Sequence, residues 1–100
     1  MTKAPLPQDE FARLTALRGL NILDTEPEGA YDDIVKLAAR LCQTPIALIS
    51  LVDERRQWFK SAYGLDVKET PRATAFCDKA ILSPTEPLIV VDAKHDPRFA

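Results

Sequence analysis

PIALISLVDERRQWFKSAYG, residues 45–64, is the stretch that decides how this chain folds. Its first part, residues 46–52, is an apolar run that only Ser50 interrupts. Alternate positions of this run are apolar on both sides, which indicates a strand covered on both faces. The next four residues, DERR at 53–56, are too highly charged to be buried and predict a turn.

The second part of the stretch, residues 57–63, predicts a return strand. It carries Trp58, Phe59 and Tyr63, which suit a pleated surface, and Gly64 ends it. Residues 45–64 therefore predict a β-hairpin. The apolar helices expected on either side of it need this hairpin as the surface on which they pack.

A first helix is expected from about residue 8 to Gly19, where a glycine favours a helix end. The short apolar segment 20–23 follows it. Together they are expected either to cover the sheet or to form a dimer contact. The apolar side of this helix is Phe11, Leu14, Leu17 and Leu20.

A second helix is expected to begin at TEPE, residues 25–28, because Thr25 and Glu28 have the spacing of a capping box. It runs to about Cys42, before Pro45 prevents its continuation. The positions expected to face the sheet are Tyr31, Ile34, Leu37 or Ala38, and Leu41.

After the hairpin, residues 65–72 predict a polar connection and residues 73–82 a helix. Thr74 is a candidate cap for this helix, and its expected buried side is Phe76, Cys77, Ala80 and Ile81. Residues 88–91, LIVV, predict a short apolar strand, and Asp96 with Pro97 predicts the start of another helix. Residues 1–7, with two prolines, are expected to be a mobile tail.

The composition is that of one small globular domain, with 46% hydrophobic and 28% charged residues. The net charge is −2 and the basic residues are scattered, so neither nucleic acid nor a membrane is an expected partner. A cytoplasmic location is expected, with no membrane insertion. His95 is the only histidine, so no metal site is expected.

Four motifs together resemble the GAF sensory domain family. They are RLTALRGLNILDTEPEGAYDDIVKLAARL (13–41), PIALISLVDERRQWFKSAYGL (45–65), ETPRATAFCDKAIL (69–82) and LIVVDAKHDPRFA (88–100). The resemblance implies an α+β fold with a profilin-like antiparallel sheet flanked by helices. Lys79 departs from the pattern, because family members often carry histidine at this position.

The resemblance also implies that residues 8–100 are the N-terminal two-thirds of a GAF domain. Later strands and a closing helix would then be missing, and strand edges would stay open. An open edge is a template for pairing with another chain. The chain is therefore expected to self-associate, to be rearranged locally, or to be a fragment of a longer protein.

The residues that catalysis would use are Asp53, Cys77, Asp92, His95 and Asp96. Cys77 and His95 would form a nucleophile with its base. The other interpretation is that Cys77 is a buried structural thiol, as Cys42 is, and that His95 is an exposed loop residue. We follow the second interpretation, so no catalytic residue is assigned and the chain is not expected to be an enzyme.

The candidate ligand-binding residues are Trp58, Phe59, Arg72, Phe76, Cys77, Asp92 and Asp96. Arg72 is expected to meet an anionic ligand or else to pair with Glu69 on the surface. Asp92 and Asp96 form a polar rim, or Asp96 only caps a helix. Trp58 and Phe59 point to opposite faces, where each either packs in the core or lines a cavity.

The function that the resemblance implies is that of a regulatory module in bacterial signal transduction. It would bind a small molecule of unknown identity, with no cofactor assigned, or dimerise. The output would be a histidine kinase of a two-component system, a diguanylate cyclase or a phosphodiesterase. Two alternatives stay open: a small reductase of the methionine-sulfoxide type that uses Cys77, and a dimerisation module without a ligand.

Overall fold

A computed structural model describes residues 7, 9–83, 85–92 and 94–97 of the chain. Within these residues the fold is α+β, as expected, with helices around an antiparallel sheet. Residues 1–6 of the predicted tail and residues 98–100 of the predicted last helix lie outside this description. The elements, in chain order, are α1 (Glu10–Gly19), α2 (Gly29–Cys42), β1 (Ala47–Val52), β2 (Arg56–Tyr63), β3 (Glu69–Pro71), the 3₁₀ turn η1 (Arg72–Thr74) and α3 (Phe76–Ala80).

The predicted hairpin is confirmed. Strands β1 and β2 pair antiparallel, with Ala47 opposite Tyr63 and Val52 opposite Gln57. The register shifts at Ile49, so that Lys60 is the extra residue of a β-bulge on β2. Five successive residues of β2, the central strand of the sheet, are buried, from Gln57 to Ser61.

Gly64 ends the hairpin because only glycine fits there. Its φ angle is +78°, and a Cβ atom at this position would lie 1.9 Å from the carbonyl oxygen of Pro45. The close approach of these two backbone segments joins the end of β2 to the entrance of β1.

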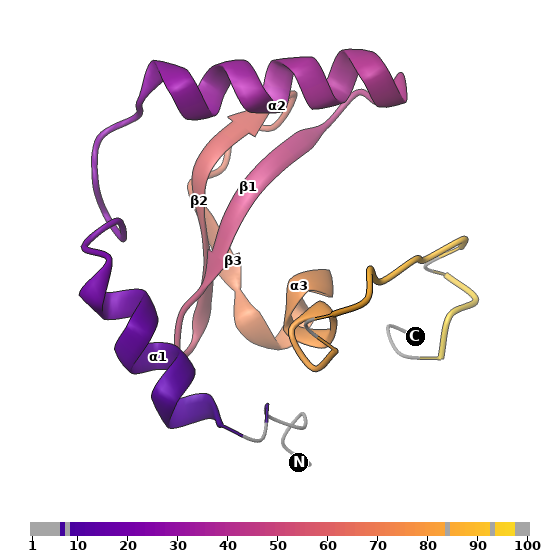
Figure 1. Ribbon diagram of the computed structural model, residues 1–100. Coiled ribbons are helices and arrows are strands. Elements are labelled where there is room, and N and C mark those ends of the chain that lie inside the picture. The colour runs from indigo at the N-terminus through magenta and orange to yellow at the C-terminus, as the bar shows by residue number, and fades with distance from the viewer. Residues whose placement is uncertain (1–6, 8, 84, 93, 98–100) are drawn as a thin grey trace.

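The sheet has the order β1-β2-β3, which makes β1 an edge strand within the described residues. The expectation that this strand is covered on both faces is also wrong, as its burial shows. Only Val52 of β1 is buried, and Leu48 is exposed. In Figure 1, α2 crosses the upper end of the hairpin, α1 lies beside its lower end, and α3 lies on the side opposite α1.

Strand β3 was not predicted from the sequence. Two of its three residues, Glu69 and Pro71, disfavour a strand, and the strand forms because Thr70 and Glu69 pair with Gln57 and Trp58 of β2. The predicted strand at 88–91 is wrong, since the structure gives these residues no strand. The predicted helix at 73–82 is replaced by η1 and the shorter α3.

Helix α2 ends at Cys42 as expected, where Gln43 adopts the left-handed conformation with φ +52°. Its start differs from the prediction. The helix begins at Gly29, and Glu28 at the N-cap position makes no side-chain cap hydrogen bond. The capping box with Thr25 is absent because both side chains contact Lys60 instead.

The buried face of α2 is also not the predicted one. Val35 and Ala39 are buried against the sheet. Ile34, Leu37 and Leu41, which were expected to face the sheet, are exposed. The helix carries two apolar stripes, and the sheet covers the one that the periodicity did not select.

Helix α1 has a single buried residue, Leu17. Phe11 and Leu20, also expected on its buried side, are exposed. Polar contacts, described below, hold this helix against the turn between β1 and β2. No helix in the described parts of the chain has the length and apolar character needed to cross a membrane.

Candidate functional site

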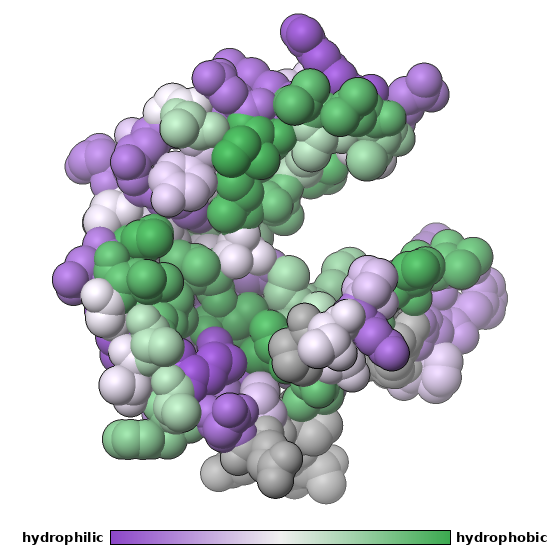
Figure 2. Space-filling model, in the orientation of Figure 1, coloured by the Kyte–Doolittle hydropathy of each residue, from purple (hydrophilic) through white to green (hydrophobic). Residues whose placement is uncertain are grey.

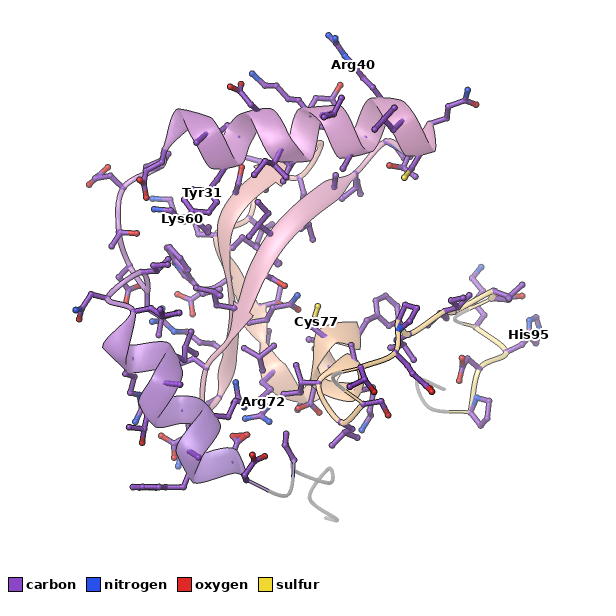
Figure 3. All side chains as sticks on the ribbon, viewed as in Figure 1. Tyr31, Arg40, Lys60, Arg72, Cys77 and His95 are labelled. Carbon is purple, nitrogen blue, oxygen red and sulfur yellow. The ribbon has the colours of Figure 1, made fainter. Side chains whose placement is uncertain are left out.

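Figure 2 shows a wide hollow between α2 and the chain segment that follows α3. We call this opening the hollow. Cys77 lies on its α3 side, and in Figure 3 its side chain points from α3 toward β1. The thiol sulfur lies 3.3 Å from the hydroxyl of Ser50 on β1. Cys77 therefore connects α3 to the edge strand.

Gln57 on β2 orders the polar groups around this thiol. Its Nε2 donates to the Cys77 sulfur at 3.1 Å and to the Ser50 hydroxyl at 2.9 Å. Its Oε1 accepts a hydrogen bond from Thr70 on β3 at 3.4 Å. The result is a chain of hydrogen bonds that runs across all three strands to α3. Gln57 and Thr70 were not predicted, because an amide in a strand carries no recognisable sequence signal.

The pairing of Cys77 with His95 does not form. The exposed ring of His95 lies 2.6 Å from Asp92, on the segment that Figure 3 shows away from Cys77. Asp92 also accepts a hydrogen bond from the backbone N–H of Lys94. His95 therefore does not serve as the base for Cys77 in this arrangement.

Arg72, a candidate for ligand binding, is buried and bonded internally. Its Nε donates to Asp78 at 2.6 Å and its Nη1 to Glu10 of α1, also at 2.6 Å. Nη1 further contacts the backbone oxygens of Asp53 and Glu54, each at 3.3 Å. Arg72 does not pair with Glu69, whose ion pair is with Arg56.

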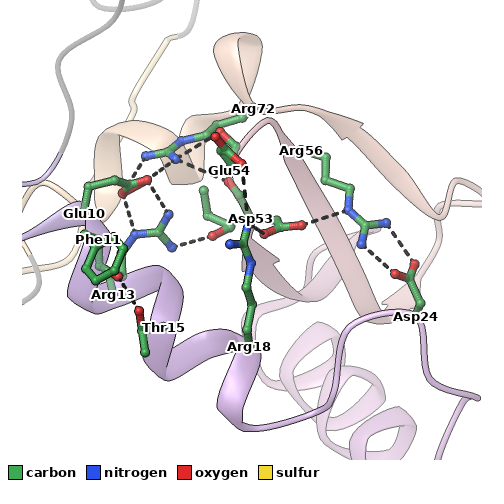
Figure 4. Close-up of polar contacts among 11 residues, drawn as sticks. Glu10, Phe11, Arg13, Thr15, Arg18, Asp24, Asp53, Glu54, Arg56 and Arg72 are labelled. Carbon is green, nitrogen blue, oxygen red and sulfur yellow. Dashed lines mark hydrogen bonds and ion pairs between the residues drawn. The ribbon is translucent and has the colours of Figure 1, made fainter.

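Ion pairs and hydrogen bonds around Arg72 hold α1 against the rest of the fold (Figure 4). Arg13 of α1 donates to Glu10 and to the backbone oxygen of Val52. Hydrogen bonds from Arg13 and then from Arg72 lower the pKa of Glu10 from 4.5 to about 2. The hydrogen bond to Glu10 and then that to Asp78 raise the pKa of Arg72 above its usual value. Glu10 and Arg72 are therefore both charged at neutral pH.

A second set of ion pairs holds the linker between α1 and α2. Arg56 binds both carboxylate oxygens of Asp24, at 2.9 and 2.7 Å, and also contacts Asp53 at 3.3 Å. Hydrogen bonds from Arg56 lower the pKa of Asp24. Burial opposes ionisation of Asp53, but hydrogen bonds from Glu54 and Arg56 leave its pKa below the usual value. Asp53 thus links these ion pairs to the charges around Arg72, because its carboxylate contacts Arg56 and its backbone oxygen contacts Arg72.

Lys60, the bulge residue, is the most deeply buried cation of the sheet, with its side chain 1% exposed. Its ammonium group donates to the hydroxyl of Thr25 and to the backbone oxygen of Glu26, each at 2.7 Å, and pairs with Glu28 at 2.6 Å. The ring of Tyr31 lies 5.5 Å away. Each of the three N–H donors has an oxygen partner, so the site is complete without a ligand.

The structure distributes the seven predicted ligand-binding residues over separate places. Trp58 and Phe59 are both buried and line a pocket of about 250 Å³ beneath the linker at 24–27. Asp92 and Asp96 line one pocket of about 510 Å³ on the segment after α3. Arg72 lies in the charge network, whereas Phe76 and Cys77 lie on α3. The seven residues therefore do not form one site.

In the described parts of the chain, no group of three or more His, Cys, Asp or Glu side chains could hold a metal ion. Both Cys42 and Cys77 are free thiols. Cys42 is exposed at the end of α2, so the expectation that it is a small buried hydrophobe is wrong.

No protein-family model matches this chain. A comparison with curated proteins shows similarity to cyclic di-GMP phosphodiesterase PA2567 of Pseudomonas aeruginosa, with 41% identity over 99 residues. The match covers 99% of this chain but 17% of that protein, so the chain spans about a sixth of the length of its relative. The expectation that the chain is not an enzyme is contradicted by this match, because the similar protein is named as one.

Proposed function

We propose that this chain is a GAF-type regulatory module of a signalling protein that acts on cyclic di-GMP. The observation that carries the proposal is the 41% identity to a cyclic di-GMP phosphodiesterase along 99% of the chain. The α+β architecture, with an antiparallel sheet between helices, supports the GAF assignment. The order and spacing of the four sequence motifs support it as well.

A small molecule would bind in the hollow, beside Cys77. Ligand sites are commonly concave and apolar, with a few polar groups in fixed positions. Cys77, Ser50 and Gln57 have such fixed positions, since hydrogen bonds join all three. The exposed ring of Phe76 on the same helix adds apolar surface. A neutral ligand with one hydrogen-bonding group fits these partners best, because none of the three is charged.

The structure offers a direct route from this site to α1. Asp78 follows Cys77 in the chain, and its carboxylate holds Arg72. Arg72 in turn holds Glu10 of α1. A ligand that shifts α3 against β1 would therefore change how firmly α1 is held, and this difference would bias two arrangements of the domain. The activity of the output domain would then depend on the position of α1.

The test uses the Pseudomonas relative as the carrier. Its matching segment is replaced by this chain, and hydrolysis of cyclic di-GMP is measured for the chimera, for the chimera with Glu10→Gln, and for the relative with the segment deleted. We expect the chimera to be active, and deletion to change the rate severalfold. Glu10→Gln should shift the rate toward that of the deletion.

Arg55→Met is the control, since Arg55 is exposed and its side chain has no part in the charge network. It should leave the rate unchanged. Equal rates with and without the segment would overturn the regulatory proposal. Equal rates for the chimera and its Glu10→Gln variant would overturn the route through Arg72 and leave the regulatory role in place.

A further inference from the structure

Two pockets meet beneath the linker that joins α1 to α2. One has a volume of about 250 Å³ and lies under residues 24–27. The other, of about 360 Å³, continues it between the start of α2 and the connection at 65–68. Four residues line both pockets, namely Pro27, Phe59, Lys60 and Lys68. The two pockets therefore form one groove, which we call the linker groove.

Hydrogen bonds hold both walls of the linker groove in place. On one side, the ammonium group of Lys60 donates to Thr25 and to the backbone oxygen of Glu26, which holds the linker against β2. In Figure 3, Lys60 lies beside the linker, below the first turns of α2. On the other side, the backbone N–H of Phe59 donates to the backbone oxygen of Lys68 at 2.9 Å. The groove is therefore formed in advance, as most sites for small molecules are.

The linker groove is separate from the hollow and from the open edge of the sheet. None of Ser50, Gln57 and Cys77 lines either pocket. All lining residues belong to the segments 24–36 and 58–68, so neither β1 nor the chain after α3 contributes a wall. Segments that the structure describes thus set the shape of the groove. A ligand there needs neither the Cys77 site nor the proposed function.

Charged side chains of both signs line the larger pocket. Asp32 of α2 accepts a hydrogen bond from the buried hydroxyl of Ser61 on β2, which fixes its carboxylate. Within the described residues, Asp32 forms no ion pair with Lys36, one turn further along α2. Lys36, Asp66 and Lys68 are exposed, and none has an ion-pair partner in that part of the chain. Two carboxylates and two ammonium groups are therefore available to a ligand.

This balance of charges selects the class of ligand. A simple anion would meet the carboxylates of the pocket, and a simple cation would meet its ammonium groups. Lys60 does not change the balance, because Glu28 pairs with it at 2.6 Å. A molecule that carries both an ammonium group and a carboxylate makes a charge-assisted hydrogen bond with each kind of group.

The size and the apolar lining of the pocket narrow the class further. At about 30 Å³ for each water molecule, a volume of about 360 Å³ accommodates roughly ten non-hydrogen atoms, which is too few for a nucleotide. Part of the ligand is apolar, because four apolar side chains also line this pocket, namely Val35, Phe59, Leu65 and Val67.

We propose that the linker groove binds an α-amino acid with an apolar side chain. Its ammonium group pairs with Asp32, whose carboxylate Ser61 holds in place. Its carboxylate faces the lysines of the pocket, Lys36 and Lys68. Its side chain lies on the apolar part of the lining.

Titration of the full chain with L-leucine tests the proposal. Binding is followed by calorimetry and by the fluorescence of Trp58, which lines the adjoining pocket. We expect a dissociation constant on the order of 100 μM, as is usual for a ligand of this size. Two analogues test the charges, since 4-methylpentanoate lacks the ammonium group and 3-methylbutylamine lacks the carboxylate. Each should bind at least about tenfold more weakly than L-leucine.

Two variants assign the charged groups to residues. Asp32→Asn keeps an acceptor for Ser61 but removes the charge, so it should weaken binding of L-leucine about tenfold and abolish the preference over 4-methylpentanoate. The double variant K36Q/K68Q should likewise abolish the preference over 3-methylbutylamine. Asp33→Asn is the matched control, with the same chemical change at the next residue of α2, which is exposed and lines neither pocket. It should bind L-leucine like the wild type.

Three results would overturn the proposal. The first is the absence of binding of both L-leucine and L-phenylalanine at roughly 10 mM, a hundred times the expected dissociation constant. The second is binding of L-leucine that Asp32→Asn leaves unchanged, which would place the ligand elsewhere. The third is a wild type that binds 4-methylpentanoate as tightly as L-leucine. Circular dichroism checks that the variants stay folded. Should Asp32→Asn unfold, K36Q/K68Q, at two exposed positions, decides the assignment.

Discussion

Arg72 is the residue whose loss should destabilise this fold most among its charged groups. It is 5% exposed and donates to two carboxylates and two backbone oxygens. We expect Arg72→Met to leave Asp78 without its strong partner. Asp78 is itself 2% exposed, and its other oxygen, Oδ2, already lacks a hydrogen bond and lies 4.0 Å from the ammonium of Lys79.

The magnitude follows from the asymmetry of buried ion pairs. Removing one partner strands a buried charge and typically costs about 3–5 kcal/mol. A domain of this size has a free energy of unfolding of roughly 5–15 kcal/mol, so Arg72→Met should remove a large share of it. With a urea m-value of about 1–1.5 kcal/mol/M, the midpoint of unfolding should fall by about 2–5 M.

The assay is urea unfolding followed by tryptophan fluorescence. Trp58 is the only tryptophan of the chain and is buried on β2, so its emission reports the opening of the sheet. The double variant R72M/D78L should be more stable than Arg72→Met alone, because it removes the stranded charge. Arg55→Met should change stability by no more than about 0.5 kcal/mol. A loss under about 1 kcal/mol for Arg72→Met would refute the reasoning.

Three further outcomes are expected. The pKa of Glu10 is about 2 when folded and 4.5 ordinarily, so its contribution is complete above pH 4.5 and is lost as the pH falls toward 2. It amounts to at most roughly 3 kcal/mol. In acid titrations followed by circular dichroism, Glu10→Gln should be less stable than the wild type at neutral pH and equally stable near pH 2. Gly64→Ala should lower the melting temperature strongly, because its Cβ would lie 1.9 Å from the Pro45 oxygen. Gly19→Ala should leave the melting temperature equal or higher, because Gly19 is in a helix and its Cβ would have no atom within 4 Å. A small effect of Gly64→Ala would contradict the backbone approach. Lys60→Met should destabilise the fold by about 1–3 kcal/mol and speed amide hydrogen exchange at residues 24–28, since the linker loses its buried partner. Unchanged exchange there would show that Lys60 does not hold the linker.

Several local features of the fold could be predicted from the residues alone. The long apolar run at 46–52, the charged DERR and the aromatic return strand predict the hairpin because strand and turn propensities agree there. The ends of both long helices were also predictable, at Gly19 and Cys42. In each case the signal is steric or concerns the solvation of nearby residues, so no distant partner is needed to interpret it.

The outcomes that differed from the predictions all depend on a partner distant in sequence. Strand β3 forms because β2 offers hydrogen bonds to a polar segment, whereas the apolar residues 88–91 find no strand partner in the described part of the chain. Periodicity gave α2 two apolar stripes, and only the position of the sheet decided that Val35 and Ala39 would be buried. A distant partner also decided the role of Arg72, one of the candidate site residues. Its guanidinium can bind an anion, and in this fold that anion is the carboxylate of Glu10 on α1.

The sequence by itself determined the hairpin and the C-terminal ends of the two long helices, because propensity and patterning act over a few neighbouring residues. The tertiary structure alone decided which face of each helix is buried, which cations are neutralised internally and which apolar stripe of α2 stays exposed. The physical reason is that burial and ion pairing depend on which distant segments meet, and a one-dimensional pattern does not specify that.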